Sequence, residues 1–176
     1  MRNVMRQMRS LGRRQTGLSL LELLVAVLVT AIGVLGVTSL QMLSLQGNRL
    51  ALQRNEAVLL AYDIMDRIRA NPGGAYGVAV GDAPVAPTNC VTTNCAAAAI
   101  TTFDESIWKC TLGGFRGEAV CTDLVTAGVI PAAAQQPGLP AGDGSITVAG
   151  GVVTVVVQWN DTSTGQTVSV TIASQT

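Results

Sequence analysis

Residues Arg13–Thr30 read RRQTGLSLLELLVAVLVT, so two arginines lead into an apolar run that contains one carboxylate, Glu22. The apolar run continues to Leu40. Over Leu18–Leu40, 23 residues, the members that are neither apolar nor glycine are Ser19, Glu22, Thr30, Thr38 and Ser39. At about 1.5 Å per residue this segment forms a helix of roughly 35 Å, enough to cross a hydrocarbon core of about 30 Å. The sequence therefore predicts one membrane-spanning helix.

The basic residues before the apolar run predict its orientation. Five arginines and no acidic residue precede Gly17: Arg2, Arg6, Arg9, Arg13 and Arg14. Because basic residues flank the cytoplasmic end of a span, we expect the N-terminus inside and everything after Leu40 outside. The chain after Gly17 holds 6 basic and 11 acidic residues. It therefore lacks the basic surface of a nucleic-acid-binding protein, and no nucleic-acid partner is expected.

A second helical pattern follows the apolar run directly. The segment 41–70 has no proline, and apolar residues recur in it every three or four positions: Ala57, Leu60, Ala61, Ile64, Met65 and Ile68. Charged residues occupy much of the other side: Arg54, Glu56, Asp63, Asp66, Arg67 and Arg69. The sequence Asn71-Pro72-Gly73-Gly74 ends the pattern. We expect one long helix over 18–71, with the membrane segment at 18–40 and an amphipathic second half.

The C-terminal segment changes to the two-residue period of β-strands. Three β-branched runs lie between residues 145 and 174, separated by Gly and Asn/Asp clusters. Two apolar faces are predicted, one made by Val153, Val155, Val157 and Trp159, the other by Val168, Val170 and Ile172. An antiparallel meander of about three strands needs a cover for its apolar face, and the amphipathic half of the helix provides one. The predicted fold class is therefore α+β, with a globular domain over 72–176.

Between helix and sheet the pattern predicts little regular structure. Gly73–Pro87 is rich in Gly, Ala and Pro and is expected to be a loop. Asp104 is a plausible N-cap for a short helix through ESIWKCTL, with Ile107 and Trp108 on its buried side. Five acidic residues are expected to lie in solvated turns and not at a calcium site: Asp82, Asp104, Glu105, Asp143 and Asp161.

Four cysteines lie in the segment 89–142: Cys90, Cys95, Cys110 and Cys121. An even number of cysteines in an exported domain indicates two disulfides with three possible connectivities. The spacing favours pairing of neighbours, Cys90 with Cys95 and Cys110 with Cys121. The rival interpretation is a zinc site, but C-x4-C followed by C-x10-C is poor ligand spacing.

The sequence holds no arrangement typical of catalysis. It has no His, no nucleophile motif, no phosphate-binding Gly loop and no spaced metal ligands. We therefore expect no enzymatic activity, no cofactor and no metal.

Three explanations compete for Glu22. A secretory signal cut near Ala31 leaves unexplained why the apolar run continues past that point. A permanent anchor explains the length, but a carboxylate in lipid costs on the order of 2.5 to 3.5 kcal/mol without a partner. Cleavage between Gly17 and Leu18 supplies that partner. The new α-amine of Leu18 lies four residues, one helical turn, from Glu22 and can neutralise it within one chain or between neighbours.

The segment 17–26, GLSLLELLVA, resembles the class III signal of type IV pilins and type II secretion pseudopilins. That signal is a basic leader ending in Gly, then an apolar residue, usually Phe, with Glu at the fifth mature position. Here Leu18 replaces the Phe. The resemblance implies removal of a leader over 1–17, N-methylation of Leu18 by a prepilin peptidase, and pairing of Glu22 with a subunit N-terminus during assembly.

Further stretches resemble PilV-type minor pilins, also called type IV pilus modification proteins. They are AIGVLG (31–36), the helical segment 48–72, FDESIWK (103–109) and VTVVVQWND (153–161). The end of that helical segment, DIMDRIRANP, is what favours this branch over other pilin-like proteins. Over the cysteine-bearing segment 89–142 we expect the match to fade, so the role of this segment is not taken from the family.

The resemblance implies a structural subunit held by one helix in the bacterial inner membrane before it enters a pilus, with its C-terminal domain in the periplasm. The implied partners are other minor pilins, the major pilin, the prepilin peptidase, the inner-membrane assembly platform and a tip adhesin. The alternatives are a type II secretion pseudopilin, a periplasmic binding module on a permanent anchor and, last, an anchored enzyme.

Overall fold

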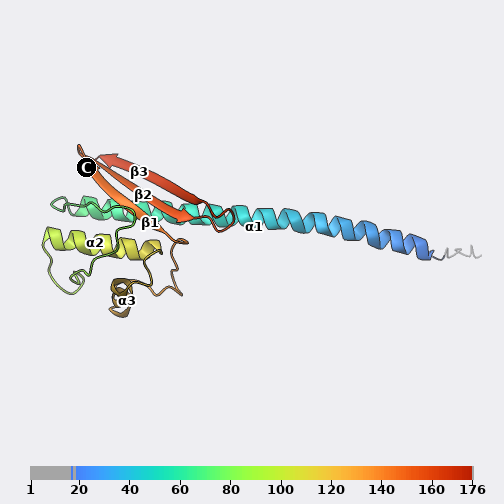
Figure 1. Ribbon diagram of the computed structural model, residues 1–176, viewed down its shortest axis with the longest axis horizontal. Helices are drawn as coiled ribbons and strands as arrows, with labels where there is room; N and C mark the ends of the chain where they lie inside the picture. Colours follow the sequence, from blue (N-terminus) through green and yellow to red (C-terminus); the bar gives the residue numbers. More distant parts are fainter. Residues whose placement is uncertain (1–16, 18, 176) are drawn as a thin grey trace, which may run out of the picture. The chain divides into compact units, whose positions relative to one another are not determined.

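The structure, a computed structural model, describes Gly17 and residues 19–175. Residues 1–16 of the expected leader 1–17, and Leu18, lie outside these described residues. Figure 1 labels three helices and three strands, whose bounds are α1 Leu20–Ala70, α2 Ala97–Leu112, α3 Ala119–Thr126, β1 Asp143–Ala149, β2 Val152–Asn160 and β3 Thr167–Gln175. The chain divides into two units, one ending at Ser44 and the other beginning at Leu45.

In the N-terminal unit the chain is helical from Leu20 onward. Ser19 caps this helix, because its side-chain oxygen accepts a hydrogen bond from the Leu21 amide at 3.3 Å. Within the apolar segment, the hydroxyl of Thr30 donates to the Ala26 carbonyl at 2.9 Å. Thr38 and Ser39 likewise donate to backbone carbonyls one turn earlier. These polar side chains are therefore satisfied by the helix itself.

In the C-terminal unit the three strands form one antiparallel sheet in the order β1-β2-β3. Burial alternates along β2, where every second residue from Val153 to Trp159 is buried. This face packs against Ala57, Leu60, Ala61, Ile64, Met65 and Ile68 of α1. Figure 1 shows the strands lying along this half of the helix. The predicted α+β class, a long helix packed on a three-stranded antiparallel sheet, is confirmed.

Helix α2 contradicts the expected short helix capped by Asp104. It begins at Ala97, and Asp104 lies buried in its middle. A run of alanines with high helix propensity extends the helix toward its N-terminus, and Asp104 is instead bonded to other segments. Trp108 is fully buried as expected, and its indole N–H donates to the Leu60 carbonyl at 3.0 Å.

A close contact joins α2 to the sheet. A Cβ at Gly144 of β1 would lie 2.6 Å from the Trp108 ring and 2.5 Å from the Val156 carbonyl oxygen. Only glycine therefore fits where the large aromatic side chain crosses the strand.

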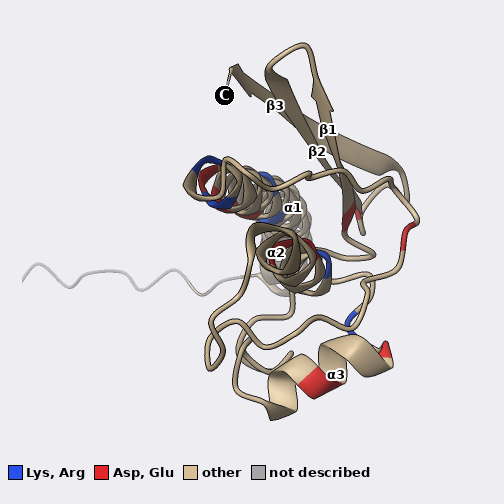
Figure 2. Ribbon diagram, turned by 90° about the vertical axis from the view of Figure 1, so that its left-hand side faces the viewer, with Lys and Arg blue, Asp and Glu red and all other residues tan. Residues whose placement is uncertain are grey.

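The short helix α3 was not predicted from the sequence. Together with α2 it forms a second apolar cluster around Phe103, Ile107, Leu124 and Ile130. Both views place α2 between α1 and α3, so the second cluster lies on the side of α2 away from α1 (Figure 2).

Candidate processing and assembly segment

The described part of α1 up to Ser44 presents an apolar surface that nothing in the structure covers. Its large apolar side chains are exposed throughout, from 90% at Leu20 to 51% at Val25. This helix is apolar enough to cross a membrane, with a mean hydropathy of 2.6 in its most apolar window. Such a surface is stable only in lipid or against other apolar helices, because water makes exposure of this area costly.

Gly17 and Glu22 lie at the start of this surface. Gly17 is exposed. Glu22 lies in the first turn of α1 and is exposed. A carboxylate in a first turn is favoured by the partial positive charge of the helix N-terminus. Since Leu18 lies outside the described residues, the expected pairing of its amine with Glu22 stays a prediction.

The two glycines of the apolar segment leave a shallow hollow on the helix surface. Apart from the chain neighbours and the nearby backbone of the helix itself, no atom of the described residues lies within 4 Å of a Cβ position at Gly33 or Gly36. The hollow is lined by Thr30, Gly33, Val34, Val37, Thr38 and Gln41. Small residues of this kind allow another helix to approach closely.

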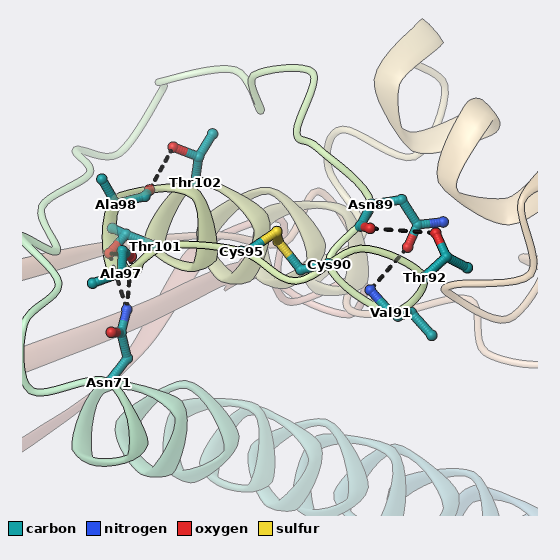
Figure 3. The surroundings of a disulfide bond; sticks show 10 residues. All are labelled: Asn71, Asn89, Cys90, Val91, Thr92, Cys95, Ala97, Ala98, Thr101 and Thr102. Carbon is teal, nitrogen blue, oxygen red and sulfur yellow. Dashed lines mark hydrogen bonds between the residues drawn. A yellow bond between two sulfur atoms is a disulfide. The ribbon is translucent and has the colours of Figure 1, made fainter.

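The end of α1 is bonded to α2 through polar side chains. Asp104 of α2 accepts hydrogen bonds from the Tyr76 hydroxyl at 2.7 Å and from Arg67 Nη1 at 3.1 Å. Asn71 donates to the Ala97 carbonyl at 2.9 Å and to Thr101 at 3.3 Å (Figure 3). Arg67 and Asn71 belong to DIMDRIRANP, so in this structure that motif attaches α2 to the end of the long helix.

Burial and the nearby Asp104 carboxylate together raise the pKa of Tyr76 to about 12. Burial disfavours the charged phenolate, and the hydrogen bond to a carboxylate favours the protonated hydroxyl. Tyr76 therefore serves as a hydrogen-bond donor over the physiological pH range.

A buried ion pair joins α2 to β1. Lys109 is 1% exposed, and its ammonium lies 2.5 Å from Asp143 Oδ1 and 2.8 Å from the Ala79 carbonyl. The other oxygen of Asp143 accepts a hydrogen bond from the Gly81 amide at 2.6 Å. The pair thus holds the loop after α1 against both elements.

The expectation that five acidic residues lie in solvated turns is wrong for Asp104, Asp143 and Asp161, which are all buried. Their oxygens are used within the protein. Asp104 and Asp143 accept hydrogen bonds from distant segments, and Asp161 accepts them from Ser163 and Thr164 in its own turn. Glu105 is half-buried and accepts a hydrogen bond from the Gly77 amide. Burial raises the pKa of Glu105.

Among the described residues no group of three or more His, Cys, Asp and Glu could hold a metal ion.

Both disulfides join cysteines that are neighbours in the sequence, as the spacing favoured. Cys90 and Cys95 close a turn in which the Asn89 side chain accepts a hydrogen bond from the Val91 amide at 3.0 Å (Figure 3). Cys110 and Cys121 join α2 to α3 inside the second apolar cluster. The described residues hold no free cysteine.

A half-open hollow of about 410 Å³ lies beside the end of α1. It is lined by Ile68, Arg69, Asn71, Pro72, Gly74, Tyr76, Val148 and Val153. Its polar side chains are already bonded: Arg69 to Asp66 and Ser174, Asn71 and Tyr76 to each other. The polar groups of these three side chains are therefore bonded within the body.

Two family models match adjacent parts of the chain. Residues 12–38 match the prokaryotic N-terminal methylation motif, and residues 39–106 match the family described as Type IV pilin Tt1218. The first match contains Gly17 and Glu22, and the second ends within α2. No curated protein and no solved structure matches the chain. The two matches support a pilin or pseudopilin subunit that carries a class III signal.

Proposed function

We propose that this chain is a PilV-like minor pilin that primes or supports assembly of a type IV pilus. The observation that carries the proposal is the exposed apolar surface of α1, which begins at Leu20 and includes Glu22 inside an N-terminal methylation motif. A helix of this kind has two favourable environments, the bilayer before assembly and the helical core of a filament after it.

The processing step explains the position of Glu22. A prepilin peptidase removes residues 1–17, and the amine of Leu18 is N-methylated. On entry into a filament this amine pairs with Glu22, within the chain or on a neighbouring subunit, and the pair offsets part of the cost of removing both charges from water. Before assembly the helix anchors the chain in the inner membrane with its body in the periplasm.

The C-terminal body supplies a stable surface for partners in this proposal. Two disulfides and the buried Lys109–Asp143 pair hold its loops in place. The partners are the major pilin, other minor pilins and the inner-membrane assembly platform. A tip adhesin is a further candidate partner.

A minor pseudopilin of a type II secretion system is the second candidate. The methylation motif and the exposed apolar helix serve that function equally well, because pseudopilins assemble by the same helix contacts. The two functions are distinguished by the process that is lost when the chain is removed, either assembly of the pilus or secretion through the type II system.

Deletion of the chain's gene tests the proposal. Surface filaments should be lost or strongly reduced while secretion through a type II system continues. Wild type and Thr30→Ala should restore filaments, and Glu22→Ala should not. Thr30 is the control because it lies in the same exposed apolar segment without a charge.

Normal piliation in the deletion strain contradicts a priming role, and loss of secretion alone favours the pseudopilin. The mature N-terminus, measured by intact mass with and without the peptidase, should begin at methylated Leu18 only when the peptidase is present. A start at Met1, or one near Ala31 in both cases, removes the basis of the proposal.

A further inference from the structure

The two outer edges of the sheet differ in whether their backbone groups are paired. The outer edge of β1 is paired at its centre with the loop after α1, because Val78 and Ile146 exchange two backbone hydrogen bonds of 2.8 and 3.2 Å. The Gly81 amide donates to the side chain of Asp143 at the start of the same strand. The loop therefore obstructs addition of another strand at residues 143–146 of this edge.

The outer edge of β3 is open. Over residues 19–175, no backbone–backbone hydrogen bond links β3 to any segment other than β2. Its inward side chains Val168, Val170 and Ile172 pack on the core, and the alternate residues are exposed. A nine-residue strand thus presents unpaired backbone N–H and C=O groups along one side.

The open edge of β3 lacks the charged residues, prolines and bulges that usually prevent another strand from pairing with an edge. No charged residue and no proline occurs between Thr162 and Gln175. The register with β2 runs without a bulge from Asn160↔Thr167 to Val152↔Gln175. Exposed edges of soluble proteins are normally protected by lysines, prolines or bulges, and an unprotected edge is a template for another strand.

We propose that β3 is a docking strand, and that it binds an extended strand at the sheet edge of a different pilin-like subunit. The chemistry of the edge selects this partner, because a row of free amide and carbonyl groups is matched by an extended backbone. The uncharged Ser and Thr side chains beside it favour an equally uncharged strand. This inference rests on the proposed function, which supplies neighbouring subunits in the same membrane.

The direction of β3 excludes a second copy as the partner in a closed pair. The strand runs alongside α1 in the same direction: the turn before it forms a hollow with Gln46, Arg49 and Gln53, and Ser174 near its end bonds to Arg69 at 2.8 Å. Figure 1 shows the same course. Two copies joined through β3 on a twofold axis must have antiparallel strands, so their Leu45 ends would point in opposite directions.

Membrane attachment does not permit that arrangement. Four residues separate Leu40, the end of the apolar segment, from Leu45. Each body must therefore keep its Leu45 end near the membrane, which antiparallel bodies in one membrane cannot do. A parallel stack of identical copies would instead need β3 to meet β1 of the next copy, and at the centre of that edge Ile146 is already paired with Val78.

The test is site-specific photocrosslinking in living cells. The full chain carries a photoreactive residue at Thr171 of β3 or, as the matched control, at Thr147 of β1; both positions are exposed. The crosslinked peptide is then identified by mass spectrometry. The expected product joins Thr171 to a predicted edge strand of another protein with an N-terminal methylation motif, and Thr147 does not form it.

A second variant keeps the fold and blocks the edge. Ser169→Lys/Thr171→Lys with the photoreactive residue at Thr167 should lower the crosslink yield at least about tenfold, equivalent to about 1.4 kcal/mol of lost binding free energy. Thr147→Lys/Ala149→Lys on β1 is the control and should leave the yield unchanged. Circular dichroism checks that both variants are folded.

The outcomes separate the two proposals. If filaments depend on the chain but the Thr171 probe yields no pilin-like partner, or only a second copy, the docking proposal is overturned and the proposed function stands. An unchanged yield in the β3 lysine variant also overturns it. If filaments form normally without the chain, the proposed function fails whatever the crosslinks show.

Discussion

Arg67 Nη1 lies 3.1 Å from Asp104 Oδ1, which joins the last turns of α1 to the middle of α2 across 37 residues of sequence. The second oxygen of the same carboxylate accepts the Tyr76 hydroxyl at 2.7 Å. Burial alone would lower the pKa of Arg67, but hydrogen bonds and charge from Asp63 and Asp104 outweigh it and raise the pKa. One buried carboxylate therefore connects the long helix, the loop after it and α2.

Removing this carboxylate should destabilise the body. Asp104→Ala leaves the Tyr76 hydroxyl without its acceptor and should lower the free energy of unfolding by about 1 to 3 kcal/mol. Asp66→Ala removes only the exposed ion pair with Arg69 and should cost less than about 1 kcal/mol. Urea unfolding of both variants in detergent, followed by tryptophan fluorescence, measures the difference. Equal losses in the two variants would show that the buried Asp104 carboxylate contributes no more stability than the exposed ion pair.

The raised pKa of Tyr76 predicts a loss of stability at alkaline pH. Its folded value of about 12 lies above the ordinary value of 10.0, so the stabilisation is present below pH 10 and is lost as the pH rises toward 12. Tyr76→Phe cannot ionise and should flatten stability against pH in this window. Melting temperatures between pH 8 and pH 12 test this, with Tyr62→Phe at an exposed site as control. The same slope in wild type and Tyr76→Phe would contradict the assignment.

The contacts of the Lys109–Asp143 pair predict which of two substitutions destabilises the body more. Asp143→Ala leaves the Gly81 amide without its acceptor and the buried Lys109 ammonium without a counter-charge, with the Ala79 carbonyl still bonded to it. Lys109→Met leaves a carboxylate that keeps its backbone donors. Breaking a buried ion pair costs about 3 to 5 kcal/mol, and Asp143→Ala should be the more damaging of the two. Thermal unfolding should rank the variants in this order, and the reverse order would refute the account.

The two disulfides should differ in their contribution to stability. Cys110 and Cys121 are buried in the second apolar cluster, whereas Cys90 and Cys95 lie in a partly exposed turn. Replacing Cys110 and Cys121 together by Ala should cost about 3 kcal/mol or more, because the closed loop is longer and α3 loses its covalent link. The Cys90→Ala/Cys95→Ala pair should cost about 2 kcal/mol. Denaturant unfolding under non-reducing conditions compares them, and a larger loss for the second pair would be inconsistent with this structure.

Alanine in place of the two glycines of the apolar segment should stiffen the helix without steric cost. Because no atom lies near either Cβ position, Gly33→Ala/Gly36→Ala should stabilise the helix by about 1 kcal/mol per site. Slower amide exchange around these positions in micelles is the expected result. The exposed Gly47 provides the control: Gly47→Ala should slow exchange only near its own position.

Periodicity in the sequence predicted the large elements correctly. The recurrence of apolar residues from Ala57 to Ile68 marked the face of α1 that packs on the sheet, and alternation marked the buried residues of β2. These predictions succeed because side-chain direction in a regular helix or strand depends on residue spacing alone. The cluster of Gly17, Leu18 and Glu22 is likewise visible as a local motif.

The tertiary structure was needed wherever a side chain bonds to a distant segment. Asp104, Asp143 and Lys109 have no local pattern that distinguishes a buried ion pair from a solvated turn, because their ion-pair partners lie 34 or more residues away. The start of α2 at Ala97, the presence of α3 and the open edge of β3 also depend on which segments pack together. Spacing along the chain reveals the faces of regular elements, while long-range packing selects their partners, since burial and hydrogen bonding depend on neighbours in space.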